Sequence, residues 1–271
     1  MAPIVIEPTG SWSALNLRDV WAHRELLYFL TLRDLKVRYK QTIFGVAWVA
    51  LQPLLMTLVF TIVLGRLVRL PSNGLPYAVF AYAGLMLWIF FAGALSITSN
   101  CLVGNANLIT KIYFPRLIVP LASIAARVVD LVVSLAIMLL LLLYYRIPLS
   151  WQILMVPVII LLVSLFALAL GLWTSAVNVK YRDVGLVLPV FIQLWMFVSP
   201  IVYPLQTIPA KWRLIYCLNP IAGIVENFRA SLFGYPFDWP SLVVAAVVTL
   251  TLLIYSAYAF QARQKTFADI V

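Results

Sequence analysis

The stretch YRDVGLVLPVFIQLWMFVSPIVYP, residues 181–204, decides what kind of protein this chain forms. It begins with the charged pair Arg182 and Asp183 and then continues without charge to its end, over a length that can cross a lipid bilayer. Aromatic side chains recur along it, and Ser199-Pro200 interrupts its far end. We therefore expect a membrane helix with one charged end in water and one end broken by proline.

The composition of the whole chain indicates an integral membrane protein. Of its 271 residues, 64% are hydrophobic and 10% are charged, and the mean hydropathy is +1.03. Soluble domains average about 25% charged residues, so this chain cannot cover its apolar surface with polar groups. The formal charge of +10 suits nucleic acid, but in a membrane protein cytoplasmic Lys and Arg account for it better. No cleavable signal peptide is expected, because the first 40 residues lack a basic stretch followed by an apolar one.

Six segments are apolar and long enough to span a membrane. They predict an all-α integral membrane fold with one transmembrane domain, residues 42–262, between a cytoplasmic amphipathic segment (1–41) and a cytoplasmic tail (263–271). The expected spans are residues 42–65, 77–100, 120–144, 151–177, 184–203 and 239–260.

Residues 20–40 can form an amphipathic helix in the membrane interface. Its apolar face is expected to carry Tyr28, Leu32, Leu35 and Tyr39, and Arg33, Lys36 and Lys40 share another face. Topological anchoring and docking of a partner remain equally open for this helix.

Three shorter elements complete the pattern. Residues 105–116 interrupt the apolar sequence, and they predict a short cytoplasmic helix that Asn105 or Asn107 can cap and Pro115 ends. Residues 205–238 carry too many charges to span, so they predict two short re-entrant or interfacial helices on the outer face. The second, residues 221–233, is stopped by Gly234 and has an apolar stripe formed by Ile221, Ile224, Val225, Phe228 and Leu232.

The distribution of Lys and Arg orients this topology. The cytoplasmic segments of the scheme hold twelve of the 19 basic residues and the outer loops hold six, which are Arg66, Arg69, Arg146, Lys211, Arg213 and Arg229. Both termini are therefore expected in the cytoplasm. The two cysteines, Cys101 and Cys217, fall on opposite sides and are expected to be unpaired, without metal-ligand spacing.

The remaining basic residue, Arg127, lies inside the third span, three positions from Asp130. Residues at this spacing meet on one helix face, and charges at such depth face protein or water. We favour a structural ion pair between packed helices, with a role in translocation as the alternative.

The sequence shows no residues arranged for catalysis, metal binding or nucleotide hydrolysis. It has one histidine, His23, and no nucleophile constellation, metal cluster or GxxxxGK[ST] phosphate loop. It also lacks the unpaired ionisable groups and internal repeat typical of ion-coupled carriers. A membrane-embedded enzyme is thus the least favoured class, and a transporter of this kind needs an energy source from a cytoplasmic partner.

Four motifs resemble the transmembrane subunit of ABC-2-type exporters, in particular the polysaccharide branch that moves O antigen, teichoic acid or capsule. They occur in the family's order and extend over nearly the whole chain. They are RDLKVRYKQTIFGVAWVALQPL (33–54), NLITKIYFPRLIVPL (107–121), the opening stretch (181–204) and LNPIAGIVENFR (218–229).

The resemblance implies a homodimer with two separate nucleotide-binding subunits, which bind ATP and Mg, and no cofactor in this chain. Residues 105–116 match the coupling helix that docks into the ATPase subunit, and residues 205–233 match outer gate helices. The docking candidates are Asn107, Lys111, Tyr113, Phe114 and Arg116, with Tyr113 and Phe114 as apolar anchors. Residues 20–40 match the family's interface helix, and the candidates beside the cytoplasmic entrance are Arg33, Lys36, Arg38, Tyr39 and Lys40.

Aromatic rings suit a path for a polymer, because flat rings stack on the apolar faces of sugars. The candidates are Phe44, Trp48, Trp88, Phe91, Trp195, Phe197 and Tyr203. Taken singly, each fits packing between helices better; Trp195 and Phe197 are favoured as wall residues because they precede the Ser199-Pro200 break.

The sequence therefore predicts the membrane half of an ATP-driven exporter of a lipid-linked polysaccharide in a bacterial inner membrane. An ABC-2 exporter of a drug or lipid is the alternative within the same fold. A stand-alone channel or secondary carrier is the alternative of another class.

Overall fold

The computed structural model describes residues 17–40, 45 and 47–270, and every regular element in these ranges is a helix. The N-terminal part forms α1 (Leu17–Ala22) and α2 (Arg24–Tyr39), followed by α3 (Ala47–Phe60), which passes into a π-helical turn, η1 (Thr61–Leu67). The other elements are α4 (Tyr77–Gly104), α5 (Ala106–Lys111), α6 (Ile118–Tyr144), η2 (Trp151–Met155), α7 (Val156–Lys180), α8 (Val184–Val198), η3 (Leu205–Thr207), α9 (Ala210–Cys217), α10 (Pro220–Phe233) and α11 (Trp239–Ile270).

Five helical segments of the described chain are long and apolar enough to cross a membrane. They coincide with five of the six predicted spans and are 47–67, 77–104, 118–144, 151–180 and 239–264. The sixth, α8, has 15 residues and is therefore about 22 Å long at 1.5 Å per residue, against a hydrocarbon core of about 30 Å. Its irregular continuation to Pro204 lengthens it, and the count of six spans stays a prediction.

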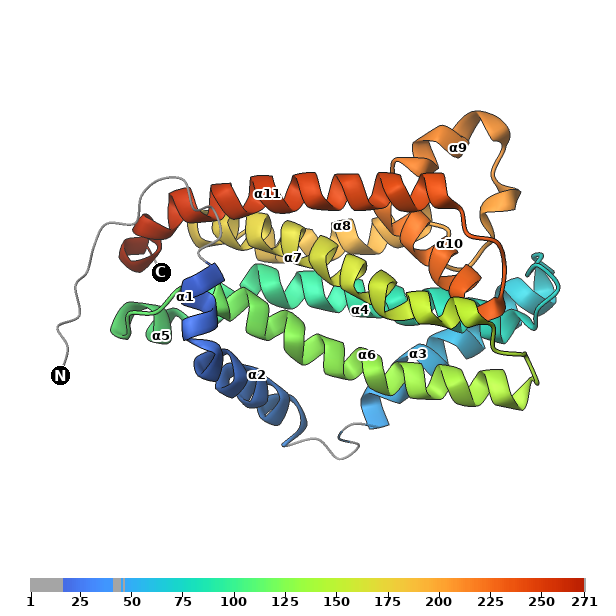
Figure 1. Cartoon of the computed structure of the whole chain (residues 1–271), viewed down its shortest axis with the longest axis horizontal. Coiled ribbons are helices and arrows are strands. Elements are labelled where there is room, and N and C mark those ends of the chain that lie inside the picture. Colours follow the sequence, from blue (N-terminus) through green and yellow to red (C-terminus); the bar gives the residue numbers. More distant parts are fainter. Residues whose placement is uncertain (1–16, 41–44, 46, 271) are drawn as a thin grey trace.

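Helix α4 is the centre of the bundle, with α6 and α3 on one side and α7 and α11 on the other (Figure 1). Side chains all around α4 are buried, including Phe80, Tyr82 and Phe91. The outer helices bury one side and expose Val, Leu and Ile on the other, which is the pattern that lipid contact favours. Four of the five long helical segments therefore surround the fifth, α4, in a manner suited to a bilayer.

Helix α10 confirms the apolar stripe expected from the sequence and extends it. Every residue of α10 except Glu226 is buried. Asn219 caps its start by accepting a hydrogen bond from the Ile221 amide, and Gly234 ends it at φ 74°, a left-handed conformation that glycine adopts without strain. The helix thus lies among α4, α7 and α11.

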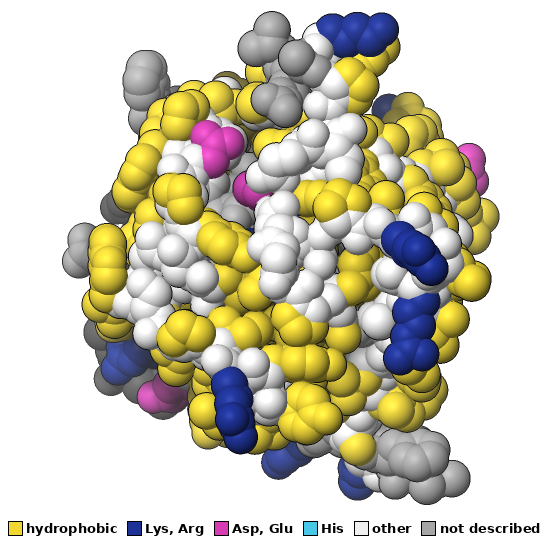
Figure 2. All heavy atoms as spheres, turned by 90° about the vertical axis from the view of Figure 1, so that its right-hand side faces the viewer, with side chains coloured by type: hydrophobic (Ala, Val, Ile, Leu, Met, Phe, Trp, Pro, Cys, Tyr) yellow, Lys and Arg dark blue, Asp and Glu magenta, His cyan; other side chains and the backbone are white. Residues whose placement is uncertain are grey.

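The short elements divide between the two ends of the bundle. Helices α1 and α5 lie at the same end as the C-terminal part of α11, and α9 and the connection from η1 to α4 lie at the other (Figure 1). Figure 2 shows this second end, where apolar side chains cover most of the surface and scattered Lys and Arg side chains stand among them. We call these the α5 end and the α9 end.

Candidate functional site: the α5 end and a charged pocket

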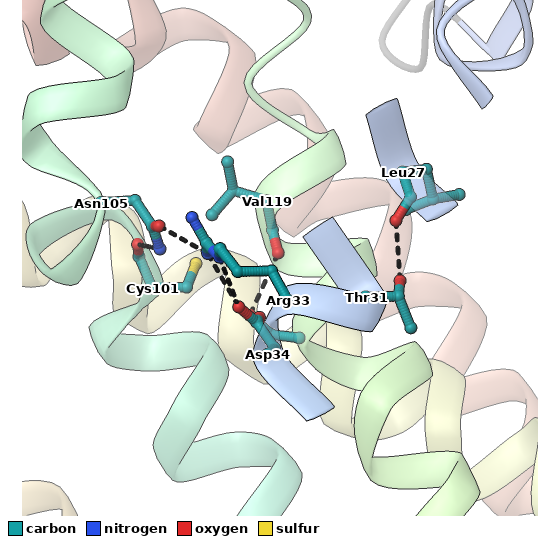
Figure 3. A network of polar contacts seen from close by, with 8 residues as sticks. Leu27, Thr31, Arg33, Asp34, Cys101, Asn105 and Val119 are labelled. Atoms are coloured by element: carbon teal, nitrogen blue, oxygen red, sulfur yellow. Dashed lines mark hydrogen bonds and ion pairs between the residues drawn. The ribbon is translucent and has the colours of Figure 1, made fainter. Parts of the chain in front are cut away.

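The loop that carries α5 is tied to α2 by a polar contact. Asn105 occupies the N-cap position of α5 but makes no capping hydrogen bond with its side chain. Its amide donates to the Cys101 carbonyl (2.8 Å), and its Oδ1 accepts from Arg33 of α2 (2.7 Å), as Figure 3 shows. Arg33 also donates to Asp34 (2.8 Å). The start of α5 is therefore held by α2 as well as by α4.

The docking candidates fall on different sides of this loop. Asn107 and Lys111 are exposed, Arg116 is half-buried, and Tyr113 is 89% exposed. Phe114 is only 5% exposed and belongs to the hydrophobic core. The predicted pair of apolar anchors is therefore divided, and Ile112, which is 57% exposed, is a second exposed apolar side chain beside Tyr113. Helix α5 ends at Lys111, four residues before Pro115.

The side of α2 that faces the bundle carries leucines that the sequence analysis did not single out. Tyr28 is 61% exposed, whereas Leu30 is buried and Leu26 and Leu27 pack against the core. Arg38 and Tyr39 at the end of α2 turn toward α6, while Lys36 and Lys40 remain exposed. Arg38 turns inward for an electrostatic reason, because a carboxylate on α6 pairs with it away from water.

That carboxylate is Asp130, which joins three side chains into one cluster. Arg38 and Tyr39 of α2 both donate to it, and Arg127 donates to its Oδ2 from one turn earlier on α6 (3.3 Å). Asp130 is 6% exposed. Burial first, and the hydrogen bond to Asp130 second, raise the pKa of Tyr39 to about 12, so its hydroxyl is a neutral donor at pH 7. The predicted Arg127–Asp130 contact is present, but it is part of a larger tie between α2 and α6.

A pocket of about 260 Å³ opens beside this cluster, which we call the Asp130 pocket. Its walls come from α3, α4 and α6 and from the end of α2. They are formed by Arg38, Tyr39, Gly45, Trp48, Val49, Gln52, Pro53, Met86, Ile89, Phe90, Arg127, Asp130, Leu131 and Ser134. One side is thus charged and the other apolar. It brings together residues that the sequence assigned separately to the entrance, the path and the ion pair.

The remaining path candidates are distributed between packing and exposed positions. Trp88, Phe91 and Trp195 meet in one aromatic cluster with Phe166, which sequence reasoning missed. Phe91 stacks on Phe166 with ring centroids 5.4 Å apart. Trp88 and Phe91 are 4% and 0% exposed, so in this structure they pack the interior. Phe166 was recognisable only as one more apolar residue of its span.

Three further candidates lie outside this cluster. Phe197 is 60% exposed and Trp48 53% exposed, while Tyr203 is half-buried and donates to the Phe197 carbonyl (3.0 Å). Phe44 lies outside the described residues. On α8, Phe197 therefore offers its ring to an open surface, whereas Trp195 is half-buried and donates to Asn219 (3.2 Å).

At the α9 end, Arg229 corrects a sequence assignment. It was counted among the outer-loop charges, but it is 2% exposed and donates to the Pro200 (3.0 Å) and Ile201 carbonyls. Burial lowers the pKa of Arg229 to about 10, and Glu226 opposes that shift, so the guanidinium stays charged at neutral pH. Five basic residues are left for the outer loops, which strengthens the charge asymmetry between the two ends.

In the described ranges, no group of three or more His, Cys, Asp or Glu side chains could hold a metal ion, and both Cys101 and Cys217 are free thiols. What the structure shows is an exposed loop at one end, a charged pocket partway along α4 and α6, and a buried joint at the other end.

Comparison with known proteins agrees with this arrangement. The family described as ABC-2 type transporter matches residues 25–233. An O-antigen export system permease protein of Myxococcus xanthus is 29% identical over 258 residues, with 94% of this chain and 98% of the relative covered. A protein of the same description from Klebsiella pneumoniae is 26% identical (91% and 95% covered), and a polysialic acid transport protein of Escherichia coli is 24% identical (87% and 92% covered). The matched region contains α2, α5, the Asp130 pocket and α10, and the chain belongs to the ABC-2 type transporter family.

Proposed function

We propose that this chain is the membrane subunit of an ATP-driven exporter that moves a lipid-linked polysaccharide, of the O-antigen, teichoic acid or capsule type, across a bacterial inner membrane. The observation that carries the proposal is the near full-length similarity to permeases named for O-antigen and polysialic acid transport. An exporter of a drug or another lipid within the same family is less well supported, because these relatives are all named for polysaccharides.

In this proposal the α5 end is cytoplasmic and docks the ATPase subunit. Two features support it: the excess of Lys and Arg in the segments of this end, and the exposed side chains of Lys111, Ile112 and Tyr113 on one loop. An apolar side chain surrounded by polar ones is the usual anchor of a protein interface. The partner subunit binds ATP and Mg and hydrolyses the nucleotide, and two copies of each subunit assemble.

The cargo enters at the α2 side and leaves at the α9 end. The Asp130 pocket and the exposed Lys36 and Lys40 support an entrance for an anionic lipid head. The exposed aromatic face of α8, with Phe191 and Phe197, supports a path along which sugars stack once the second copy closes it. The short helices α9 and α10 then form the outer gate.

The proposal is tested by purifying the chain with its ATPase partner and by deleting its gene. We expect the lipid-linked polymer to stimulate ATP hydrolysis, and we expect the deletion strain to lose its surface glycan. Hydrolysis that does not respond to the polymer, together with a normal surface glycan, would contradict the polysaccharide assignment. Transport in liposomes by this chain alone would instead show a channel or carrier.

A further inference from the structure

The Asp130 pocket holds more positive than negative charge. Two guanidinium groups, those of Arg38 and Arg127, face a single carboxylate, and no other charged residue of the described chain lines it. Tyr39, Gln52 and Ser134 supply only neutral polar groups. The described lining therefore carries a net charge of +1 in a setting where water is scarce, which favours binding of an anion.

The donors of the cluster exceed its acceptors. Each guanidinium carries five N–H groups, whereas Asp130 offers two oxygens to Arg38, Tyr39 and Arg127 together. Two oxygens cannot accept from all of these N–H groups, and an anion with more oxygens than a carboxylate would accept from those that face the pocket.

Gly93 on α4 leaves room for the Arg127 side chain. A Cβ atom at Gly93 would lie 2.8 Å from the Arg127 guanidinium, so in this position the side chain lies directly against the α4 backbone.

The empty volume argues against a purely structural ion pair. A buried water needs about 10–15 Å³ of cavity, and the Asp130 pocket measures about 260 Å³. Its apolar wall includes Trp48, which is 53% exposed on α3, where Leu55 and Val59 are also exposed. The charged side thus continues into a face suited to an acyl or isoprenoid chain, which points to a lipid headgroup rather than a free ion.

We propose that Asp130 is an internal placeholder for a phosphate group, and that the phosphate-bearing head of a lipid cargo binds Arg38 and Arg127 in its place. One part of this inference rests on the proposed function, namely that the lipid bound in the pocket is the transported cargo. A phosphate that binds Arg38 and Arg127 removes these partners from Asp130. The contacts that Asp130 makes with α2 are then lost, and α2 separates from α6. No bond is made or broken other than hydrogen bonds and ion pairs.

The displacement reaches the α5 end through α2. Arg33 lies five residues before Arg38, about 7.5 Å along the helix, and it holds Asn105 at the start of α5. One helix is therefore tied to the pocket at its C-terminal end and to the ATPase-docking loop near its middle. Freeing the pocket end lets α2 and α5 shift together, so that an occupied pocket is signalled to the ATPase subunit.

The experiment measures binding of hexyl phosphate to the complex of this chain with its ATPase subunit, in maltoside micelles without nucleotide, by ³¹P NMR titration. Inorganic phosphate and hexanol (the latter by competition) separate the contributions of charge and chain. A phosphate site on the ATPase subunit contributes equally in every variant, so comparison between variants cancels it. We expect hexyl phosphate to bind more tightly than inorganic phosphate; equal affinity would indicate a free anion as the ligand.

Two substitutions carry the test, with one matched control. Arg127→Gln should weaken hexyl phosphate binding about tenfold, as loss of a charge-assisted contact does. Asp130→Asn should strengthen it about tenfold, because the internal competitor is gone. Arg66→Gln, an exposed arginine of η1 at the α9 end, should leave it unchanged. A structural ion pair predicts the opposite for Asp130→Asn, which would then lose affinity or leave it unaltered.

If Asp130→Asn does not fold, Tyr39→Phe tests the placeholder role instead, because it removes one donor to Asp130 without changing any charge. It should tighten hexyl phosphate binding about twofold to fivefold and raise ATP hydrolysis measured without cargo. Unchanged binding in a folded Tyr39→Phe protein, or binding in Arg127→Gln equal to that of the wild type, would overturn the placeholder role. Surface glycan that is exported normally in that case would leave the proposed function intact.

Discussion

The guanidinium of Arg229 on α10 lies 3.7 Å from the ring centroid of Phe80 on α4. At this distance the cation lies on the negatively charged face of the ring, an interaction that is stronger where water is excluded. The same guanidinium donates to the Pro200 and Ile201 carbonyls just beyond α8. A single side chain thus joins three elements at the α9 end.

Arg229→Lys should lower the stability of the protein although it keeps the charge. A lysine ammonium cannot lie flat on Phe80 and reach two carbonyls at once, so we expect a loss of about 2 kcal/mol and a lower midpoint of thermal unfolding in detergent. Arg146→Lys is the matched control, because Arg146 is exposed. Equal unfolding midpoints for both variants would contradict the role given to Arg229.

Gly84→Ala should be poorly tolerated. A Cβ atom at Gly84 would lie 2.1 Å from the Ile201 carbonyl oxygen and 2.5 Å from the Arg229 guanidinium, and overpacking of this kind costs about 1–3 kcal/mol or more. Gly104→Ala, at the end of the same helix, meets nothing within 4 Å and should be neutral or slightly stabilising. Comparing the yield of folded protein and the thermal midpoint of the two variants checks this; a Gly84→Ala protein as stable as Gly104→Ala would refute it.

Tyr113→Ala and Phe114→Ala should have different effects although the residues are neighbours. Tyr113 is 89% exposed, so its loss should weaken co-purification with the ATPase subunit and leave thermal stability unchanged. Phe114 is 5% exposed, and its loss should destabilise the chain itself by about 3–5 kcal/mol. Normal co-purification of the Tyr113→Ala variant would argue against docking at this loop.

Thiol labelling can test the orientation without any mutation, because the chain has two cysteines. Cys217 on α9 is half-buried, whereas Cys101 on α4 is buried. With the α9 end outside, a membrane-impermeant maleimide should label Cys217 in spheroplasts, and Cys101 should react only after denaturation. Labelling of Cys217 in inverted vesicles alone would mean that the orientation is reversed.

Sequence reasoning succeeded where a pattern of apolar residues was sufficient. The span around Phe91, the stripe on α10 and the stop at Gly234 all follow from hydrophobic periodicity and from glycine's conformational freedom. The contact between Arg127 and Asp130 was predictable because it lies within one helix.

Sequence reasoning failed where a long-range partner decides the position of a side chain. Arg38 was named as a candidate beside the entrance, but its contact with Asp130, 92 positions later, was not predicted. Arg229 likewise looked like a loop charge, although two backbone carbonyls and a ring keep it buried. Phe114 has no periodicity around it that separates it from Tyr113. In each case the missing information is a contact between distant segments, which one sequence does not contain.

The joint beyond α8 restricts how the α9 end of the protein can move. Ser199-Pro200 breaks the helix and resembles a hinge, yet the Ser199 hydroxyl accepts from Asn219, the next two carbonyls accept from Arg229, and the Val202 carbonyl accepts from Tyr77. These donors belong to α4 and to α10 with its cap. Four hydrogen bonds therefore tie the end of α8 to α4 and α10, so a movement at this end carries the three helices together and has its pivot elsewhere in the bundle.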